Sequence, residues 1–346
     1  MRQFAELRIK NLEFRIYLKN NPRHDLPRAS ENWKYRVLKP RKLWTQLRLP
    51  LDLYMHKSRP DVFFSPSHYA PRFSPVPSVI SVMDLSFLYY PELFNKRDLF
   101  QLHSWTAYSV KKAKKIITIS NSSKNDIIKE YKIGPGGVYV TYPGIKSFTS
   151  LNPQIYAMNQ LKTKYNLDKR YILFVGTVQP RKNIARLIEA FSKLDEKDLE
   201  LVIVGKKGWL YEEIFEKPEQ LGIEEKVKFL DQVTNDELPM LYKHAVCMVL
   251  PSLYEGFGLP ILEAMKNDCP VITSNVSSLP EAGGDACLYV NPEEVDDIAE
   301  TMSKLINDGK LRKELIEKGR KQVTKFSWEN TARETLRVLE EVGGQT

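Results

Sequence analysis

The stretch Pro251-Ser-Leu-Tyr-Glu-Gly-Phe-Gly-Leu-Pro-Ile-Leu-Glu263 decides the fold, together with the apolar run Ala245-Val-Cys-Met-Val-Leu250 before it. Such an apolar run predicts a strand that is buried in a parallel sheet. Gly256 and Gly258 predict a turn after the strand, and a helix should begin near Leu259. A strand end, a glycine turn and a helix start leave backbone N–H groups directed at one place, where an anion can bind.

Two carboxylates flank this predicted anion site. Glu255 lies at the mouth of the helix and Glu263 lies about one turn inside it. Both can accept hydrogen bonds from sugar hydroxyls while the amides hold phosphate. The alternative is an ordinary βα unit, in which the glycines only make the turn and Glu255 is a solvated loop acid. The local pattern leaves both interpretations open.

A basic segment, Gly176-Thr-Val-Gln-Pro-Arg-Lys-Asn183, follows the strand predicted over 171–175 and opens a helix. Arg181 and Lys182 can neutralise a diphosphate, Arg181 as a fork and Lys182 as a point charge. Negative charge grows on a diphosphate when its bond to a sugar breaks, so a transferase needs cations there. The alternative is a solvated basic helix start, but cations there oppose the helix dipole unless an anion is present.

Strands and helices are predicted to alternate, which is typical of doubly wound α/β sheets. The chain of 346 residues is too long for one compact core, so two domains are expected, over 1–150 and 151–326. The helix predicted over 42–57 is amphipathic, with Leu43, Leu47, Leu51 and Met55 at a spacing of four, and a last helix starts with Ser327 as its N-cap. The expected strands are 14–18, 33–38, 61–64, 78–82, 116–120, 137–142, 171–175, 199–204, 226–230, 245–250, 270–273 and 287–290, and further helices are expected at about 96–114, 122–131, 293–307 and 310–323.

Composition and charge narrow the class of protein. No apolar run approaches the roughly 20 residues that cross a bilayer, and the first ten residues do not resemble a secretory signal. Cys247, Cys269 and Cys287 lack metal-ligand spacing, so we expect buried thiols in a reducing compartment, the cytoplasm. Residues 1–150 carry a net charge of +15 and residues 151–346 one of −6. The basic half indicates an anionic partner, although a solvated basic surface is the alternative.

The pattern Glu-x7-Glu from Glu255 to Glu263, with Gly-Phe-Gly-Leu-Pro between, resembles the signature of the retaining glycosyltransferases of family 4, which have the GT-B fold. The resemblance covers about residues 14–342. It implies two facing Rossmann-like, doubly wound domains with an interdomain cleft: an N-terminal acceptor-binding domain and a C-terminal nucleotide-sugar-binding domain. The final helix, 327–346, would pack back on the first domain.

The resemblance fails at the start of the chain. Relatives open with a strand and a glycine-rich loop, and nothing like them precedes Phe14. The N-terminal domain is therefore expected to lack its first βα unit.

The resemblance also implies a donor site. Glu263 would bind the ribose hydroxyls, and Glu255 and the amides after it would contact the donor sugar and the diphosphate. Thr177 stands where many relatives carry Arg, and for Lys206 a solvated loop position is the alternative. The implied donor-site residues are Gly176, Thr177, Arg181, Lys182, Gly205, Lys206, Glu255, Gly256, Phe257, Gly258, Leu259 and Glu263.

On the acceptor side, Met83-Asp84 stands where relatives usually carry His-Asp, whose His contacts the donor sugar. Methionine cannot usefully hydrogen-bond a hydroxyl or shuttle a proton. We predict His68, Met83, Asp84 and Asn121 as acceptor-side residues, with structural roles for His68 and Asp84 as the alternative. The predicted catalytic residues are Asp84, Arg181, Lys182 and Glu255.

The predicted function is retaining, metal-independent transfer of a hexose, with mannose favoured, from a nucleotide diphosphate sugar to a glycan or polyprenyl-diphosphate-linked acceptor in surface polysaccharide assembly. No cofactor or metal is expected, because the chain has no Asp-x-Asp and no cluster of metal-ligand spacing. The Pro180-Arg-Lys-Asn183 form resembles that of relatives that use GDP-mannose, so the resemblance implies GDP-mannose in preference to UDP-sugars. The alternative is a catalytically weak or inactive nucleotide-sugar-binding protein of the same fold. A nucleic acid partner is not expected, because it would not explain the motifs of the second domain.

A membrane contact is also predicted. The cluster Lys111–Lys115 and the aromatics Phe100, Trp105 and Tyr108 suggest a basic amphipathic face for the inner surface of the plasma membrane. The alternative is that these aromatics are core residues.

Overall fold

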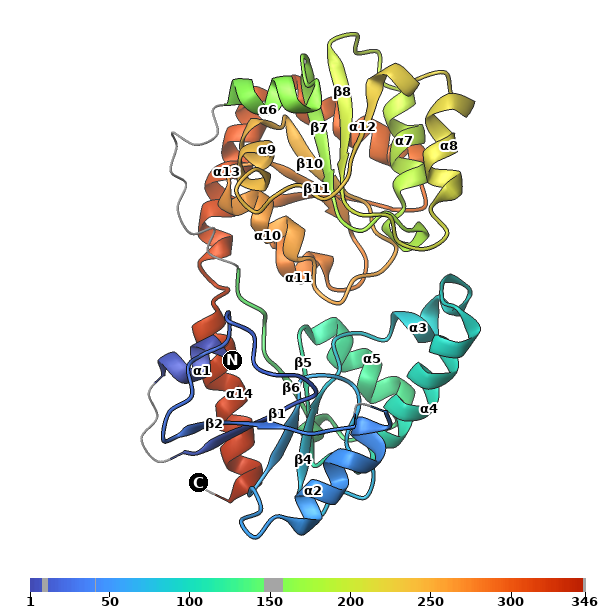
Figure 1. The fold of residues 1–346 in the computed structure, drawn as a ribbon. Helices are drawn as coiled ribbons and strands as arrows, with labels where there is room; N and C mark the ends of the chain where they lie inside the picture. Colours follow the sequence, from blue (N-terminus) through green and yellow to red (C-terminus); the bar gives the residue numbers. More distant parts are fainter. Residues whose placement is uncertain (8–11, 41, 146–157, 345–346) are drawn as a thin grey trace. The chain divides into compact units, whose positions relative to one another are not determined.

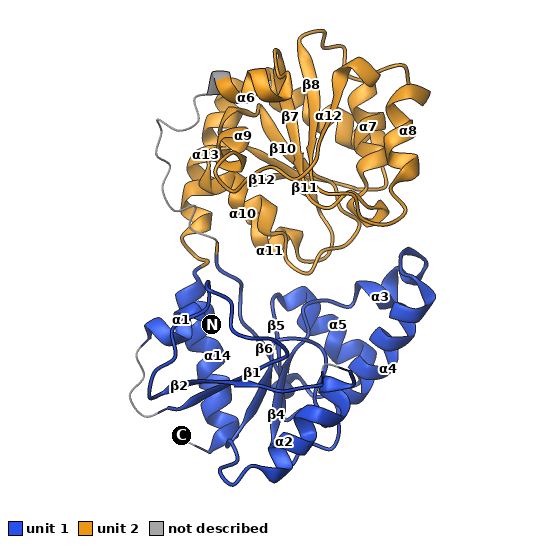
Figure 2. Ribbon diagram, viewed as in Figure 1, with its two compact units in different colours: residues 1–144, 327–346 blue, residues 145–326 orange. Residues whose placement is uncertain are grey.

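The computed structural model describes residues 1–7, 12–40, 42–145 and 158–344 (Figure 1). These residues divide into two compact units (Figure 2): unit 1 is Met1–Gly144 with Ser327–Thr346, and unit 2 is Ile145–Phe326. Each unit contains a parallel β-sheet with helices packed on it, so the predicted α/β class is confirmed.

Unit 2 is built on a six-stranded parallel sheet with the strand order β12-β11-β10-β7-β8-β9. The chain runs outward from β7 to β9 on one side and from β10 to β12 on the other, so its direction reverses between β7 and β10. Ligands bind beyond the carboxyl ends of the strands at such a reversal. The strands are β7 Arg170–Val175, β8 Leu199–Val204, β9 Val227–Leu230, β10 Cys247–Leu250, β11 Val271–Ser274 and β12 Cys287–Val290.

Helices flank this sheet on both sides, and all six residues of β8 are buried, as expected for a covered parallel sheet. Helices α7, α8 and α12 form one contiguous group, and α10 packs with α9, α11 and α13 in another (Figure 1). The helices are α6 Met158–Tyr165, α7 Ile184–Ser192, α8 Glu212–Gln220, α9 Leu238–His244, α10 Leu259–Lys266, α11 Leu279–Gly283, α12 Val295–Asn307 and α13 Gly309–Val323, with 3-10 turns η4 Pro180–Lys182 and η5 Glu224–Lys226.

A buried carboxylate, Glu237, joins α6 to the start of α9. It accepts hydrogen bonds from Lys164 Nζ at 2.5 Å, from Tyr165 Oη at 3.0 Å and from the Thr234 backbone N at 2.9 Å. Burial alone would raise the pKa of Glu237, but these hydrogen bonds outweigh it and lower the pKa to about 2. The side chain is therefore an ionised part of the folded unit.

Unit 1 contains a four-stranded parallel sheet, β3-β4-β5-β6, and a separate parallel pair, β1-β2. Tyr17 of β1 contacts Phe63 of β3 with ring centroids 6.3 Å apart. Within the described ranges no strand joins the two sheets. The strands are β1 Phe14–Leu18, β2 Trp33–Val37, β3 Phe63–Ser65, β4 Ser78–Ser81, β5 Lys115–Thr118 and β6 Val138–Val140.

Successive residues of β4 pack on opposite faces of the four-stranded sheet. Ile80 packs in a core with Val110 of α4 and Ile127 of α5, whereas Val79 packs with Val338 of α14. The sheet is therefore covered by α4 and α5 on one face and by α14 on the other. The helices are α1 Arg2–Glu6, α2 Leu49–Met55, α3 Ser86–Tyr89, α4 Lys96–Lys112, α5 Asn121–Tyr131 and α14 Trp328–Gly343, with a π-helical turn η1 Trp44–Arg48 and 3-10 turns η2 Pro91–Leu93 and η3 Pro135–Gly137.

Helix α14 follows unit 2 in the sequence and belongs to unit 1. Its start lies beside Gly144, the residue at which the chain leaves unit 1. The Ser327 hydroxyl caps the helix by accepting from the Asn330 backbone N at 3.1 Å, and Thr331 Oγ1 donates to the Tyr142 carbonyl at 2.5 Å. A Cβ atom on Gly144 would lie 2.0 Å from the Trp328 backbone N, so the two backbones cross too closely for a side chain. Residues 146–157, which include the predicted domain boundary at 150, lie outside the described residues.

The helix predicted over 42–57 forms as η1 followed by α2, but its packing differs from a simple amphipathic helix. Leu49 and Leu53 are buried against Leu38 and Val76, whereas the stripe from Leu43 to Met55 faces solvent. Both faces of the segment are apolar, so the spacing of four selected the wrong face.

Cys247, Cys269 and Cys287 are free and buried, as predicted. Burial raises the pKa of the Cys247 thiol to about 12, so it stays protonated near neutral pH. In the parts of the chain that the structure describes, the helices are too short or too polar to cross a membrane.

Candidate functional site

Two cations and one carboxylate meet at the carboxyl ends of β7 and β10, where the strand order of unit 2 reverses. Arg181 Nη1 lies 3.3 Å from Glu255 Oε2, and Lys182 Nζ bonds Glu255 Oε1. The three side chains are 16%, 12% and 10% exposed, respectively. The structure thus brings together three of the four predicted catalytic residues, although Glu255 lies more than 70 positions from Arg181 and Lys182 in the sequence.

The loops that carry these side chains are joined to each other by backbone and amide hydrogen bonds. The Leu253 backbone N donates to the Arg181 carbonyl at 3.0 Å, and Arg181 Nη1 bonds the Tyr254 carbonyl. Asn183 Nδ2 donates to the carbonyls of Pro251 at 3.0 Å and Pro292 at 2.6 Å. The loop after β7 is therefore fixed on the loop after β10.

Three serines that the sequence analysis missed hold Glu255 in place. Ser252 Oγ donates to Glu255 Oε1 at 2.8 Å, the Glu255 backbone N donates to Ser277 Oγ at 3.0 Å, and Ser278 Oγ donates to the Glu255 carbonyl at 2.7 Å. The sequence could have indicated Ser252 as a site residue, because it directly follows Pro251 at the end of a predicted strand. Ser277 and Ser278 follow β11, and only the sheet topology places them here.

The electrostatics of the cluster keep Glu255 ionised. Burial alone would raise its pKa, but the charges of Lys182 and Arg181 and hydrogen bonds from Lys182 and Ser252 lower it below its ordinary value. Two cations face one carboxylate, so these three side chains carry a surplus positive charge. An anion that reaches the cluster can share both cations with Glu255.

The loops after β7 and β8 approach each other closely beside the cluster, at Gly176 and Gly205. Gly205 has φ +155, and a Cβ atom on it would lie 1.8 Å from the Gly176 carbonyl oxygen. A Cβ atom on Gly176 would lie 3.8 Å from Lys182 Cε. Gly205 is therefore required by the close approach of the loops after β7 and β8.

The loop after β10 leads directly into α10. Gly258 is its N-cap with φ +104, and no side chain caps the helix. Phe257 is buried and packs edge-to-face on Phe326, with centroids 5.4 Å apart, so only its backbone can contact a ligand. The helix start has the backbone geometry that favours an anion.

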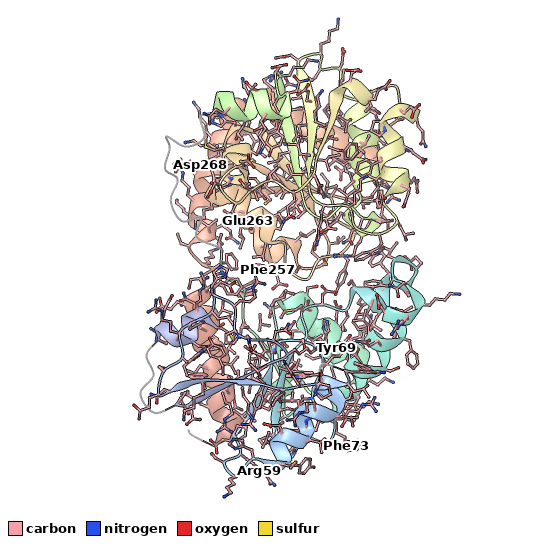
Figure 3. The ribbon with its side chains drawn as sticks, viewed as in Figure 1. Arg59, Tyr69, Phe73, Phe257, Glu263 and Asp268 are labelled. Carbon is pink, nitrogen blue, oxygen red and sulfur yellow. The ribbon has the colours of Figure 1, made fainter. Side chains whose placement is uncertain are left out.

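The remaining predicted donor residues lie around this cluster in different environments. Figure 3 shows Glu263 on α10, and Tyr242 Oη donates to Glu263 Oε2 at 3.3 Å. Lys206 is exposed, and its carbonyl accepts from the Val178 backbone N at 3.0 Å. Thr177 is half-buried and carries no charge that could replace an arginine.

The predicted acceptor-side residues follow the strands of unit 1. Asp84 Oδ1 accepts from the Ser86 backbone N at 2.9 Å, and the Met83 carbonyl accepts from Ser123 Oγ at 2.9 Å. Asn121 Nδ2 donates to Tyr142 Oη at 2.5 Å. Asp84, Met83 and Asn121 therefore each make a hydrogen bond within unit 1, at a strand end or a helix start.

His68 lies close enough to Asp84 for the two to interact. Burial lowers the pKa of His68, and the charge of Asp84 partly offsets this effect. Nδ1 of His68 is buried and has no hydrogen-bond partner among the described residues. The ring packs edge-to-face on Tyr69, with centroids 5.4 Å apart. This neutral imidazole can exchange a hydrogen bond with a hydroxyl.

Helix α4 shows a mixed surface where a basic aromatic face was predicted. Phe100 is exposed, but Trp105 packs edge-to-face on Tyr69 and Tyr108 lies under Arg72. Lys115 forms an ion pair with Glu341 at 2.9 Å. Two of the three aromatics are therefore packed, and a membrane contact at this helix stays a prediction.

Among residues 1–7, 12–40, 42–145 and 158–344, no three His, Cys, Asp or Glu side chains form a group that could hold a metal ion.

Comparison with known proteins identifies the family. Residues 159–322 match the glycosyl transferases group 1. O-antigen chain mannosyltransferase B of Escherichia coli is 33% identical over 306 residues, which are 87% of this chain and 78% of that protein. The chain belongs to the glycosyl transferases group 1 family. It is a glycosyltransferase, and its cluster of Arg181, Lys182 and Glu255 falls within the matched residues.

A further relative is similar in sequence to this chain, and solved structures are similar to it in fold. O-antigen chain mannosyltransferase RfbU of Salmonella typhimurium is 33% identical over 62% of this chain and 57% of that protein. WaaG, a glycosyltransferase involved in lipopolysaccharide biosynthesis, covers 98% of this chain and 95% of its own, with a TM-score of 0.69 and 18% identity. Sucrose-phosphate synthase from Thermosynechococcus elongatus covers 99% and 92%, with a TM-score of 0.73 and 18% identity. The predicted GT-B fold of this glycosyltransferase is therefore confirmed.

Proposed function

We propose that this glycosyltransferase moves a hexose, with mannose favoured, from a nucleotide diphosphate sugar to a glycan or polyprenyl-diphosphate-linked acceptor. The transfer retains the anomeric configuration, needs no metal ion, and serves surface polysaccharide assembly. The names of the O-antigen mannosyltransferases among the relatives support the sugar and the pathway class. GDP-mannose is the favoured donor.

The proposal that the protein binds a nucleotide diphosphate sugar rests on the cluster of Arg181, Lys182 and Glu255. This cluster lies where the strand order of unit 2 reverses. Charge develops on the diphosphate as the sugar leaves, and partly buried cations stabilise this charge more strongly than exposed ones would. The start of α10 adds backbone N–H groups to the same end of the sheet. Together these groups supply the charge that a magnesium ion supplies in metal-dependent transferases.

Glu255 has two roles in this proposal. Without donor, its carboxylate neutralises part of the charge on Arg181 and Lys182 and keeps both side chains in place. When the diphosphate binds, it shares the cations, and the carboxylate can accept a hydrogen bond from a donor-sugar hydroxyl. Glu263 on α10 is proposed to bind the ribose.

In unit 1, His68 and Asp84 are proposed to bind hydroxyl groups of the reacting sugars. The buried, unpaired Nδ1 of His68 is available for such a bond, and Asp84 keeps one carboxylate oxygen beyond its bond to Ser86. Met83 offers no comparable group. A catalytically weak nucleotide-sugar-binding protein is the second candidate, and Met83 is the residue that favours it.

The proposal is tested with purified full-length protein and GDP-mannose, UDP-glucose or UDP-N-acetylglucosamine. We expect GDP-mannose to raise the melting temperature most, and to release GDP when a polyprenyl-diphosphate-linked glycan is added. Lys182→Ala should reduce both effects, whereas Lys193→Ala, at an exposed ion pair with Asp296, is the matched control. Binding without GDP release would favour the second candidate, and no shift with any donor would refute the proposal.

Two further measurements address the finer claims. Activity should persist in excess EDTA, and loss of activity that magnesium restores would refute metal independence. NMR of the first product formed should show the anomer of the donor, and the opposite anomer would refute retention.

A further inference from the structure

The loop between β3 and β4 is fastened along helix α4. The Ala70 backbone N donates to Ser109 Oγ of this helix at 2.9 Å, and the Phe73 backbone N donates to Tyr108 Oη at 3.3 Å. The loop carries His68 shortly after the carboxyl end of β3. It therefore begins on the acceptor side of unit 1 and continues beside α4.

Aromatic rings line the course of this loop. Tyr69 packs edge-to-face on Trp105 of α4, with ring centroids 5.4 Å apart, and both side chains are half-buried. Farther along, the Arg72 guanidinium lies 5.1 Å from the centroid of the Tyr108 ring. Phe73 follows Arg72 and is 74% exposed, and Figure 3 labels Tyr69 and Phe73 on unit 1. The loop and the helix together present a row of aromatic rings that ends in the exposed ring of Phe73.

Phe73 has a backbone conformation that is unfavourable for its own side chain. Its φ is +55, in the left-handed region, where Cβ crowds the backbone and where glycine, asparagine or aspartate is the usual residue. The exposed ring gains little from burial in return. Strained residues of this kind are typical of functional sites, so the combination of strain with an exposed aromatic ring indicates a binding role.

We propose that this aromatic row is a subsite for the glycan acceptor, where sugars that precede the reacting sugar bind. The inference rests on the proposed transfer to a glycan, whose reacting end would lie near His68. The face of an aromatic ring is negative and the C–H groups of a pyranose are slightly positive, so a sugar ring stacks on Phe73. The Arg72 guanidinium beside it donates hydrogen bonds to sugar hydroxyls.

The length of the loop sets the kind of glycan that this subsite would bind. Five positions separate His68 from Phe73, and the packed pair of Tyr69 and Trp105 lies on the loop between them. A single sugar cannot contact both ends of the row. The preferred acceptor is therefore an oligosaccharide of several sugars.

Two other occupants are less favoured. A nucleotide is better matched by unit 2, where Arg181, Lys182 and the start of α10 suit a diphosphate. A second copy of the chain would need a larger apolar area, because a stable interface buries about 1,200 to 2,000 Å² in total and this row has one highly exposed ring.

The inference is tested by isothermal titration of the full chain, without donor, with disaccharides and pentasaccharides of mannose, glucose and N-acetylglucosamine. At least one pentasaccharide should bind on the order of tenfold more tightly than its disaccharide. Phe73→Asn should remove this advantage, whereas Phe73→Tyr, which keeps a ring, should retain it. The melting temperature of Phe73→Asn should equal or exceed the native value, because asparagine suits the left-handed conformation.

Phe100→Ser is the matched control, because Phe100 is 71% exposed on the same helix. It lies five positions before Trp105, which turns it about 140° around the helix axis from the face that packs on the loop. Its replacement should leave pentasaccharide binding unchanged. Phe73→Asn should also keep the native shift of melting temperature with GDP-mannose, because the donor binds in unit 2.

Three results would overturn the inference: no pentasaccharide binds more tightly than its disaccharide, Phe73→Asn keeps the advantage, or Phe100→Ser loses it as well. Light scattering tests for a second copy as occupant, and a dimer that Phe73→Asn dissociates would also overturn it. Oligosaccharide binding is measured without donor, so these results do not depend on whether the donor binds or reacts. Pentasaccharide binding without any response to GDP-mannose would instead count against the proposed transfer and leave the subsite intact.

Discussion

Replacing Glu255 by glutamine tests the charge balance of the donor cluster most directly. The substitution keeps the shape and one carbonyl oxygen, but it leaves Arg181 and Lys182 without the carboxylate that faces both. Removing one partner of a buried ion pair costs about 3 to 5 kcal/mol. We expect about 3 kcal/mol, because the two cations keep some solvent contact and the glutamine can still accept from Ser252. For a unit of this size, that loss lowers the melting temperature by about 6 to 12 °C.

The same variant should respond more strongly to an anionic ligand. Without Glu255 the two cations have no carboxylate to share, so GDP or inorganic pyrophosphate should stabilise Glu255→Gln by more than it stabilises the native chain. Calorimetry with and without ligand measures both effects.

Glu200→Gln is the matched control, because it changes a second buried glutamate of unit 2. Burial raises the pKa of Glu200, although Lys228 and Lys169 partly offset this effect. Its Oε2 has no hydrogen-bond partner within the described part of the chain. Removing its charge should therefore cost little at neutral pH. An equal loss of stability in the two variants, or a smaller ligand effect in Glu255→Gln, would refute the reasoning.

Three further predictions concern stability and transfer. The contribution of Glu237 is full above its ordinary pKa of 4.5 and is lost as the pH falls toward about 2, so acid unfolding of unit 2 should begin in that window and Glu237→Gln should flatten the change. Gly205→Ala forces a Cβ atom to 1.8 Å from the Gly176 carbonyl and should prevent stable folding as judged by circular dichroism, whereas Gly136→Ala, with no atom within 4 Å, should fold normally. His68→Ala should lower the turnover number at least tenfold with a melting temperature within a few degrees of the native value, and a proportional loss of stability would assign His68 a structural role only.

The sequence predicted the sheets of both units well, because buried parallel strands are continuous apolar runs. β1, β8 and β12 have the predicted bounds, and the other strands differ by one or two residues at one or both ends. The short helices α1 and α3 were harder to predict, since four or five residues carry too little periodicity.

The faces of the helices were less predictable than their positions. In the segment from Trp44 to Met55 both faces are apolar, so a spacing of four could not decide which one packs inward. Asp52 is buried and accepts two hydrogen bonds from Arg36 of β2, so the inward face depends on a strand that lies earlier in the sequence.

The residues of the donor cluster were predicted from the sequence, but the contacts between them were not. Arg181 and Lys182 were chosen because cations at a helix start need an anion, and Glu255 was chosen because its carboxylate can accept hydrogen bonds from sugar hydroxyls. In the structure, Glu255 is itself the anion that faces both cations. The sequence could not show that Glu255 is this partner, because the contact depends on β7 and β10 being neighbours in the sheet. For the same reason Ser277 and Ser278, which follow β11, could not be assigned to the site.

The pairing of Glu255 with both cations bears on how such a site can select its ligand. A cluster with two uncompensated cations would bind any phosphate, and it would also repel itself in the empty protein. One carboxylate removes most of that repulsion and leaves a surplus charge, so a weakly charged anion gains little by displacing it. A diphosphate carries enough charge to compete for both cations, and a sugar hydroxyl gives the displaced carboxylate a new partner. Selectivity for a nucleotide diphosphate sugar over free phosphate would then arise from the competition with Glu255, and Glu255→Gln should bind inorganic phosphate more tightly than the native chain does.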